Sequence, residues 1–368
     1  MPDDTRAREL AQALSLHGFA YVAARPSTGG WRVSAVDEGP YPVDVTGHRM
    51  IDAVGRAAAD IARRYGGYPE GGSRCDVSLV RILHGPAAPI VLTNPGARPP
   101  APTIVVVEPP PSAPLSLIPD HAEDTPIDVS GLDGIPWAEL SHAHGSAEGI
   151  PDLLRALSDP FGDWDQTLDE LLGDDLLHQG TCYSATPPAL PFLARMITSG
   201  ALPAKQRLDL CVWLLVAADR WADGLLADAD RAAAEGRPPR PATWSLDVHF
   251  AVDELVPALL TRWETEPPAV RFALACLAAL FPHHGRRIGD QITSMAYELD
   301  GTRPGAYLRL ADALVRTRDG QALDAAADIV AWDESHDPDW LNAPDLTVAV
   351  RTGHVLAEGA LRVLSDTD

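Results

Sequence analysis

Residues 135–364 repeat the apolar spacing of amphipathic helices, and this feature constrains the fold more than any other. The apolar side chains recur with a period of about 3.6 residues. Proline stands at or near the first turn of several expected helices, where its missing N–H group costs nothing because that group has no partner within the helix. The expected helices span residues 151–158, 163–177, 188–198, 203–234, 244–264, 267–281, 286–299, 304–317, 321–332 and 346–364, and the prolines are Pro151, Pro188, Pro203, Pro267 and Pro304. We therefore predict an all-α domain over residues 135–368.

Residues 137–192 join an aromatic-led segment, two amphipathic helical patterns and the polar loop HQGTCYSATPPA. This stretch resembles HEAT-repeat proteins, a family common in high-GC bacteria. The resemblance covers about residues 135–364 and implies helix pairs stacked into an α-solenoid. Members of this family differ in function, so the resemblance implies a scaffold rather than a reaction.

A second stretch, residues 267–280, carries part of the HEAT-repeat pattern. Val270 and Arg271 match the Val-Arg pair of the second helix of such repeats, and Pro267 stands where the family usually has Asp. In the family the Arg pairs with an acidic residue at the turn. The resemblance therefore implies that Glu264 or Glu266 serves Arg271 here.

Residues 1–93 mix helix and strand patterns and do not share this resemblance. Residues 5–16 and 51–65 have helical spacing, whereas the strand candidates are 19–24, 31–36, 41–45 and 76–83, with a continuation at 89–92. The order α-β-β-β-α-β indicates a small α+β domain with an antiparallel sheet. Its first five elements match the topology of double-stranded RNA-binding domains, but only His48 and Arg49 are basic at the start of the second helix, so we do not assign that function.

Residues 94–134 are the expected connection between the two domains. NPGARPPAP and EPPPSAP flank the apolar run 104–107. Proline at this density favours extended, semi-rigid chain. The predicted fold class is thus an α+β N-terminal domain, a Pro-rich linker and an all-α HEAT-like solenoid, mostly α overall.

The charge of the chain restricts the classes of partner that it can bind. The formal net charge is −23 and the pI is about 4.7. Nucleic-acid binding depends on Lys and Arg that neutralise phosphates, so we expect no nucleic-acid partner. A basic protein partner suits this charge. No stretch reaches about 18 consecutive apolar residues, and the four cysteines contain no CxxC pair. We expect a cytoplasmic protein without a membrane partner.

The loop of residues 179–186 is the strongest candidate for a partner-binding surface, because polar loops on a rigid scaffold often carry function. The candidate partner-binding residues are Gln179, Thr181, Tyr183, Ser184, His142 and His178. Tyr183 is the expected aromatic anchor. The alternative is a structural turn in which Thr186 caps the next helix.

Other histidines and one cysteine suggest weaker alternatives. A zinc site from His142, His144 and His178 would need converging imidazoles, yet His142 and His144 are two apart and would point away from each other on a helix. Cys182 near His178 would need an electropositive setting to act as a nucleophile. The cluster 283–287, HHGRR, suits the end of a helix or a phosphate or acidic partner.

The chain lacks the motifs G-x-x-x-x-G-K-[ST], G-x-S-x-G and H-E-x-x-H. We therefore expect no catalytic residue, no cofactor and no metal. The first functional hypothesis is a non-enzymatic adaptor that binds protein. The second is an immunity or antitoxin protein that neutralises a basic toxin, and the third is a small-molecule enzyme in the N-terminal domain.

Overall fold

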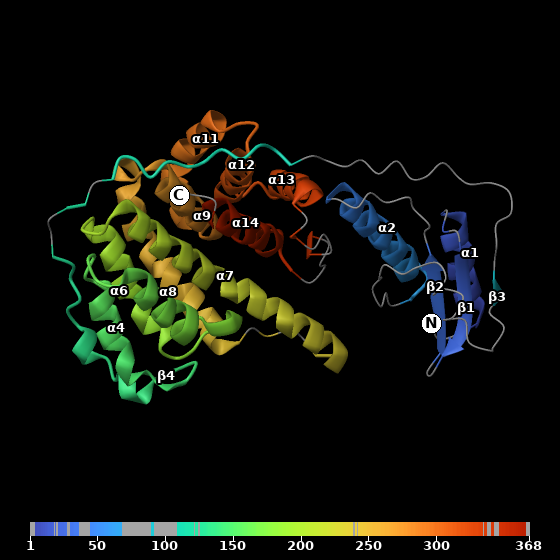
Figure 1. The fold of residues 1–368 in the computed structure, drawn as a ribbon, viewed down its shortest axis with the longest axis horizontal. Coiled ribbons are helices and arrows are strands. Elements are labelled where there is room, and N and C mark those ends of the chain that lie inside the picture. The colour runs from blue at the N-terminus through green and yellow to red at the C-terminus, as the bar shows by residue number, and fades with distance from the viewer. Residues whose placement is uncertain are drawn as a thin grey trace. The chain divides into compact units, whose positions relative to one another are not determined.

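The computed structural model describes residues 4–17, 19, 21–27, 30–36, 45–67, 90–91, 109–120, 122–123, 126–237, 240, 242–333, 335–336, 340–341 and 346–365. The chain is mostly helical (Figure 1) and divides into two compact units, residues 1–108 and 109–368. Within the described residues, none of the helices combines the length and apolarity needed to cross a bilayer.

In its described residues, the first unit contains two helices and an antiparallel sheet. Its elements are α1 (Asp4–Leu16), β1 (Tyr21–Ser27), β2 (Gly30–Val36), α2 (Val45–Arg64) and β3 (Ile90–Val91). The strands run in the order β2-β1-β3, and Ser27 faces Gly30 at the tight end of the β1–β2 hairpin. The apolar face of α1 contacts β1 and β2. It buries Leu10 and Leu14 in a small core with Phe19 and Val22.

The expected third strand, 41–45, does not end as predicted, because Val45 is the first residue of α2. The alternation of apolar and polar residues there is too short to distinguish a strand from the start of a helix. The expected strand 76–83 lies outside the described residues.

The second unit is a set of packed helices. After the short strands β4 (Ser141–His142) and β5 (Gly145–Ser146) come α4 (Ile150–Leu157), α5 (Trp164–Leu168), the π-helix η4 (Asp169–Leu176), the 3-10 turn η5 (His178–Gly180), α6 (Thr186–Ser199), α7 (Ala204–Glu235), α8 (Thr243–Leu259), η6 (Leu260–Thr265), α9 (Pro268–Leu280), α10 (Pro282–Gly285), η7 (Arg286–Ile288), α11 (Gly289–Glu298), α12 (Arg303–Val315), α13 (Asp319–Trp332) and α14 (Val348–Ser365). The first turns of α4, α6, α9 and α12 contain proline, as predicted.

Helix α9 forms the centre of this unit. Nearly all of its residues are buried, including the thiol of Cys276, as expected for a helix that is apolar on every side. It contacts α7, α12 and α14 (Figure 1). The C-terminal helix α14 also contacts α7, α12 and α13. In a regular solenoid each repeat contacts only its neighbours along the chain, whereas α14 packs back onto a helix more than 100 residues earlier in the sequence.

An extended segment, residues 109–120, satisfies the first N–H groups of three helices. The first N–H groups of a helix have no partner within it. A proline in the first turn has no N–H group, so fewer of these groups need a partner outside the helix. The hydrogen bonds join Arg303 N of α12 to Pro111 O at 3.0 Å, Ala269 N of α9 to Ser116 O at 3.1 Å, and Ala204 N of α7 to Asp120 Oδ1 at 2.6 Å.

The same segment contributes to the core of the second unit. Leu115 is buried there, and so is Leu132 farther along. Residues 109–120 and 126–134 therefore belong to the helical unit rather than to the linker predicted at 94–134. Proline density indicated an extended backbone, but an extended backbone can also dock along a row of helix ends. Residues 94–108 lie outside the described residues.

A buried ion pair joins α7 to the turn before α9. Arg207 Nε lies 3.1 and 3.0 Å from the two carboxylate oxygens of Glu266, and Arg207 Nη2 lies 2.9 Å from one of them. Arg262 Nε donates to the same carboxylate at 3.0 Å. Arg271 instead donates to the backbone carbonyl of Glu266 at 2.6 Å. The expected pairing of Arg271 with a carboxylate of Glu264 or Glu266 is thus wrong, because Arg207 and Arg262 occupy the one nearby carboxylate that is buried.

Candidate functional site

The predicted loop of residues 179–186 is held firmly against β4. Ser184 Oγ accepts a hydrogen bond from Ser141 N at 2.8 Å, and Ala185 N donates to Ser141 O at 3.1 Å. The loop begins with two residues of positive φ, Gln179 at 47° and Gly180 at 79°. Glycine adopts such a backbone freely, but for Gln179 it is strained. The loop is therefore a fixed turn with an unusual backbone.

Thr186 is the first residue of α6 and does not cap it as expected. Its buried hydroxyl donates to Leu176 O at 2.7 Å and accepts from Tyr183 N at 3.0 Å. The hydroxyl lies one position too late to accept from the N–H groups of the helix. It ties the end of η4 to the loop instead.

The structure brings the predicted partner-binding residues into one region. The ring of His144 lies 5.9 Å from that of His142 and 5.2 Å from that of His178, measured between centroids. Gln179 and Thr181 are exposed, whereas His142, His178, Tyr183 and Ser184 are half-buried. Tyr183 therefore offers only part of its ring to a partner.

The chemistry of this region does not favour a metal or a nucleophile. His142 Nδ1 lies 2.6 Å from Asp175 Oδ1. In the described part of the chain, neither of the two groups whose three ligand atoms lie within 4.8 Å of one another contains His142, His144 or His178. Burial raises the pKa of the Cys182 thiol to about 11, although Arg220 opposes this. A thiol with such a pKa is protonated at neutral pH and is a poor nucleophile.

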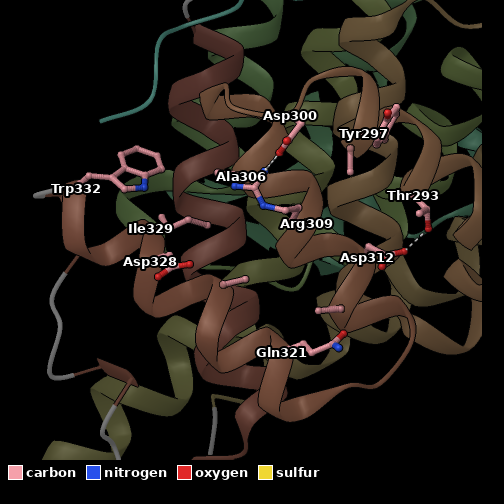
Figure 2. Close-up of a pocket in the computed structure, with 13 residues that line it drawn as sticks. Thr293, Tyr297, Asp300, Ala306, Arg309, Asp312, Gln321, Asp328, Ile329 and Trp332 are labelled. Carbon is pink, nitrogen blue, oxygen red and sulfur yellow. Dashed lines mark hydrogen bonds and ion pairs between the residues drawn. The ribbon is translucent and has the colours of Figure 1, made fainter. Parts of the chain in front are cut away.

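A second candidate site is a groove between α11, α12 and α13 (Figure 2), which the sequence did not reveal. Its volume is about 530 Å³, and the residues lining it are Thr293, Ala296, Tyr297, Asp300, Ala306, Arg309, Asp312, Ala313, Gln321, Ala325, Asp328, Ile329 and Trp332. Alanine recurs on all three helices. Because these side chains are short, they leave a hollow between the longer residues at the rim.

Some polar side chains of the groove have hydrogen-bond or ion-pair partners, and others do not. Arg309 Nη1 pairs with Asp300 Oδ1 at 2.7 Å, and Asp312 accepts from Thr293 and Arg316. Asp328 is exposed, and among the described residues no cation lies within ion-pair distance of it. Tyr297 is 84% exposed at the rim. The groove thus presents an unpaired carboxylate and a solvent-facing aromatic ring around an apolar floor.

Near one end of the groove, buried polar groups hold α14 in place. Tyr307 packs edge-on against Trp332, and its hydroxyl donates to Asp333 Oδ2 at 2.7 Å. Arg362 of α14 lies 3.3 Å from the same oxygen and 2.8 Å from His336 Nε2. Burial, together with the neighbouring charge of Arg362, lowers the pKa of His336 to about 4. A neutral His336 can therefore accept the hydrogen bond from Arg362.

A second buried pair joins α14 to α7. His354 Nδ1 lies 2.8 Å from Asp219 Oδ2, and the ring of Trp340 stacks on His354 at 4.2 Å. Burial raises the pKa of Asp219 to about 6, although the hydrogen bond with His354 opposes this. Both side chains have a partner within the protein, and this pair is one of the contacts that join α14 to α7.

Comparisons with protein-family models, with curated proteins and with solved structures found no match to this chain, so the candidate sites rest on its own geometry.

Proposed function

We propose that the chain is a non-enzymatic adaptor whose helical unit binds a basic segment of a partner protein in the groove between α11, α12 and α13. The observation that carries this proposal is the unpaired, exposed carboxylate of Asp328 beside an alanine-floored hollow. A lysine or arginine side chain fits this combination, because its aliphatic stem packs on apolar surface while its charged end reaches the carboxylate.

Charge favours a cation over an anion in the groove. Its lining contains three carboxylates and one guanidinium, a local charge of 1 − 3 = −2. The whole chain carries −23. A field of this sign attracts basic partners from a distance and speeds their association. The pair between Arg309 and Asp300 is exposed, so it adds little stability and can rearrange when a partner binds.

Tyr297 is the expected aromatic anchor of this surface. It lies on α11 at the rim of the groove and is almost fully exposed. Tyrosine is enriched among the residues that dominate binding energy at protein interfaces. An exposed tyrosine beside an acidic hollow therefore suits a partner that offers both a cation and an apolar side chain.

The test compares charge reversals at matched positions of α13. The partner is first isolated with the full-length protein from the organism that encodes it. Its affinity is then measured by isothermal titration calorimetry for the wild type, Asp328→Lys, Tyr297→Ala and the control Asp324→Lys. Asp324 is exposed on the same helix but outside the groove. Both reversals change the net charge equally, so only a local contact separates them.

We expect Asp328→Lys and Tyr297→Ala each to weaken binding by about 1–3 kcal/mol, as at other interface anchors. Asp324→Lys should slow association slightly and leave the dissociation rate unchanged. Equal losses for Asp328→Lys and Asp324→Lys would show that only overall charge matters. Unchanged binding in all three variants would remove the groove from the proposal.

Three alternatives from the sequence are tested by the same experiment. The loop around Tyr183 is a second possible partner surface, and Tyr183→Ala tests it directly. An immunity or antitoxin role is favoured by the same acidity, and it would give one abundant basic partner whose toxicity the protein suppresses. Several partners would favour the adaptor. A bound metabolite with no protein partner would favour the third hypothesis, an enzyme in the first unit.

A further inference from the structure

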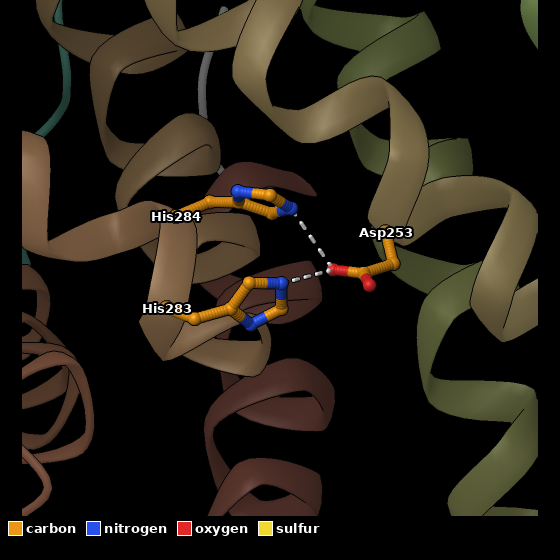
Figure 3. Close-up of side chains that lie close together, drawn as sticks. All are labelled: Asp253, His283 and His284. Atoms are coloured by element: carbon orange, nitrogen blue, oxygen red, sulfur yellow. Dashed lines mark ion pairs between the residues drawn. The ribbon is translucent and has the colours of Figure 1, made fainter.

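Three side chains from two helices converge at a corner of the helical unit that lies outside the groove. Asp253 is on α8, and His283 and His284 are on the short helix α10 (Figure 3). His283 Nε2 lies 3.1 Å and His284 Nε2 3.3 Å from the same atom, Asp253 Oδ1. The ligand atoms of all three residues lie within 4.8 Å of one another.

The turn at α10 explains why two adjacent histidines face one carboxylate. Adjacent residues on a regular helix point in different directions, but α10 is a single turn after Phe281. His284 N and Gly285 N both donate to Phe281 O. The two rings lie 3.9 Å apart and both point toward Asp253 (Figure 3).

Gly285 keeps this turn in place. A Cβ atom there would lie 2.5 Å from Ala278 O of α9 and 2.9 Å from a methyl group of Val315 of α12. Only glycine allows the turn to pack this closely. The two histidines are therefore mounted on a rigid corner rather than on a loose loop.

The carboxylate oxygen between the rings lacks a proper hydrogen bond. Asp253 Oδ1 is buried, and within the described structure no donor reaches it with hydrogen-bond geometry. A buried acceptor without a partner costs about 1–3 kcal/mol. The pair Asp219–His354 differs, because its 2.8 Å hydrogen bond and the stacked Trp340 already satisfy it.

The distances suit a metal ion between the three atoms. Zinc binds imidazole nitrogen and carboxylate oxygen at about 2.0–2.2 Å with tetrahedral geometry, which places two ligand atoms about 3.3 Å apart. The observed separations of 3.1 and 3.3 Å match this spacing. His283 is 58% exposed, so an ion can enter from solvent.

We propose that Asp253, His283 and His284 form a binding site for a divalent transition-metal ion, with zinc as the best chemical match. Two imidazoles and one carboxylate are a ligand set that zinc accepts while a fourth position stays open to water or to a ligand from another molecule. The ion would link α8 to α10, the short helix that connects α9 with α11.

The test measures zinc binding by the untagged, full-length protein. Protein stripped with a chelator is titrated with zinc chloride by isothermal titration calorimetry, and the metal retained after dialysis is measured by elemental analysis. We expect one zinc per chain and a rise in Tm with zinc concentration. His283→Ala and Asp253→Asn should each weaken binding about tenfold or more. Circular dichroism checks that both variants fold.

Matched variants distinguish this site from other places where zinc could bind. His178→Ala alters the histidine cluster near β4, Glu358→Gln alters the carboxylate beside Asp219 and His354, and His17→Ala removes an exposed histidine of the first unit. All three should bind zinc like the wild type. The proposal would be overturned if the wild type bound zinc no more tightly than His283→Ala and Asp253→Asn do.

Discussion

Removal of the Glu266 carboxylate should destabilise the helical unit more than most single substitutions can. The carboxylate accepts from Arg207 at 2.9–3.1 Å and from Arg262 at 3.0 Å, and both members of the pair Arg207–Glu266 are almost completely buried. Glu266→Ala removes this carboxylate from beside the buried Arg207 guanidinium. Breaking a buried pair in this way costs about 3–5 kcal/mol. For a unit of this size, about 2–4 °C of Tm is lost per kcal/mol, so Tm should fall by roughly 6–20 °C.

Urea unfolding followed by tryptophan fluorescence is the appropriate assay. Eight of the nine tryptophans lie in residues 109–368, so the signal reports mainly on the helical unit. The midpoint should fall while the slope m stays constant, because the surface exposed on unfolding does not change. Glu264→Ala is the matched control. Glu264 lies in the same turn and is exposed, so its removal should change stability by less than about 0.5 kcal/mol.

A double variant tests the cause of the loss. In Arg207→Met/Glu266→Leu both charges are gone, so the penalty for an unpaired buried charge disappears. This variant should recover part of the stability that Glu266→Ala loses, although Leu202 O then loses the hydrogen bond from Arg207. A loss below about 1 kcal/mol for Glu266→Ala, or a loss equal to that of Glu264→Ala, would refute the reasoning.

Three further predictions concern pH, the extended segment and the loop. Burial lowers the pKa of His336 from 6.5 to about 4, so the unfolded chain takes up this proton first as the pH falls. The stability that the neutral ring contributes is complete above pH 6.5 and is lost as the pH falls toward 4. His336→Gln keeps an acceptor for Arg362 and should flatten the dependence of unfolding free energy on pH in this window, whereas an unchanged slope would contradict the assignment. Leu115→Ala should cost about 2–5 kcal/mol in urea unfolding, while Ile118→Ala on the same segment, where the side chain is 78% exposed, should cost less than about 0.5 kcal/mol; equal costs would mean that the segment does not dock as described. Tyr183→Ala should change stability by less than about 1 kcal/mol. It should weaken partner binding by about 1–3 kcal/mol where the loop of residues 179–186, and not the groove, is the partner surface, and it should leave binding unchanged where the partner occupies the groove. A loss of several kcal/mol of stability with binding intact would instead make Tyr183 a core residue.

The helices of the second unit were predictable because their signals are local. Apolar spacing and proline placed the long helix at residues 203–234, and α7 spans Ala204–Glu235. The same signals placed α9 and α12 within a few residues of their observed ends. Such signals say nothing about which helices touch. The return of α14 to α7 brings together His354 and Asp219, two residues 135 positions apart.

The groove and the Asp253–His283–His284 cluster could not be predicted from the sequence, because local signals do not show which helices touch. Asp253 and His283 are 30 residues apart, and only the packing of α8 against the α10 corner brings them together. The cluster HHGRR was visible as a basic stretch, but its basic character concealed that two of its histidines face a carboxylate. By contrast, residues 141–144 and 178–184 were expected together and do lie side by side, because a single helical hairpin joins them.

The small residues of this chain show how an unremarkable composition can specify a surface. Alanine and glycine are abundant here, and codon bias alone would explain their number. Their positions carry more information. Alanines on α11, α12 and α13 leave the hollow of the groove, whereas Gly285 lets the α10 corner pack against α9 and α12. A larger residue at the half-buried Ala325 would fill part of the groove, but one at Gly285 would displace both histidines from Asp253. Ala325→Leu should therefore impair partner binding without affecting zinc, and Gly285→Ala should impair zinc binding while the groove remains, an outcome that a single shared site could not produce.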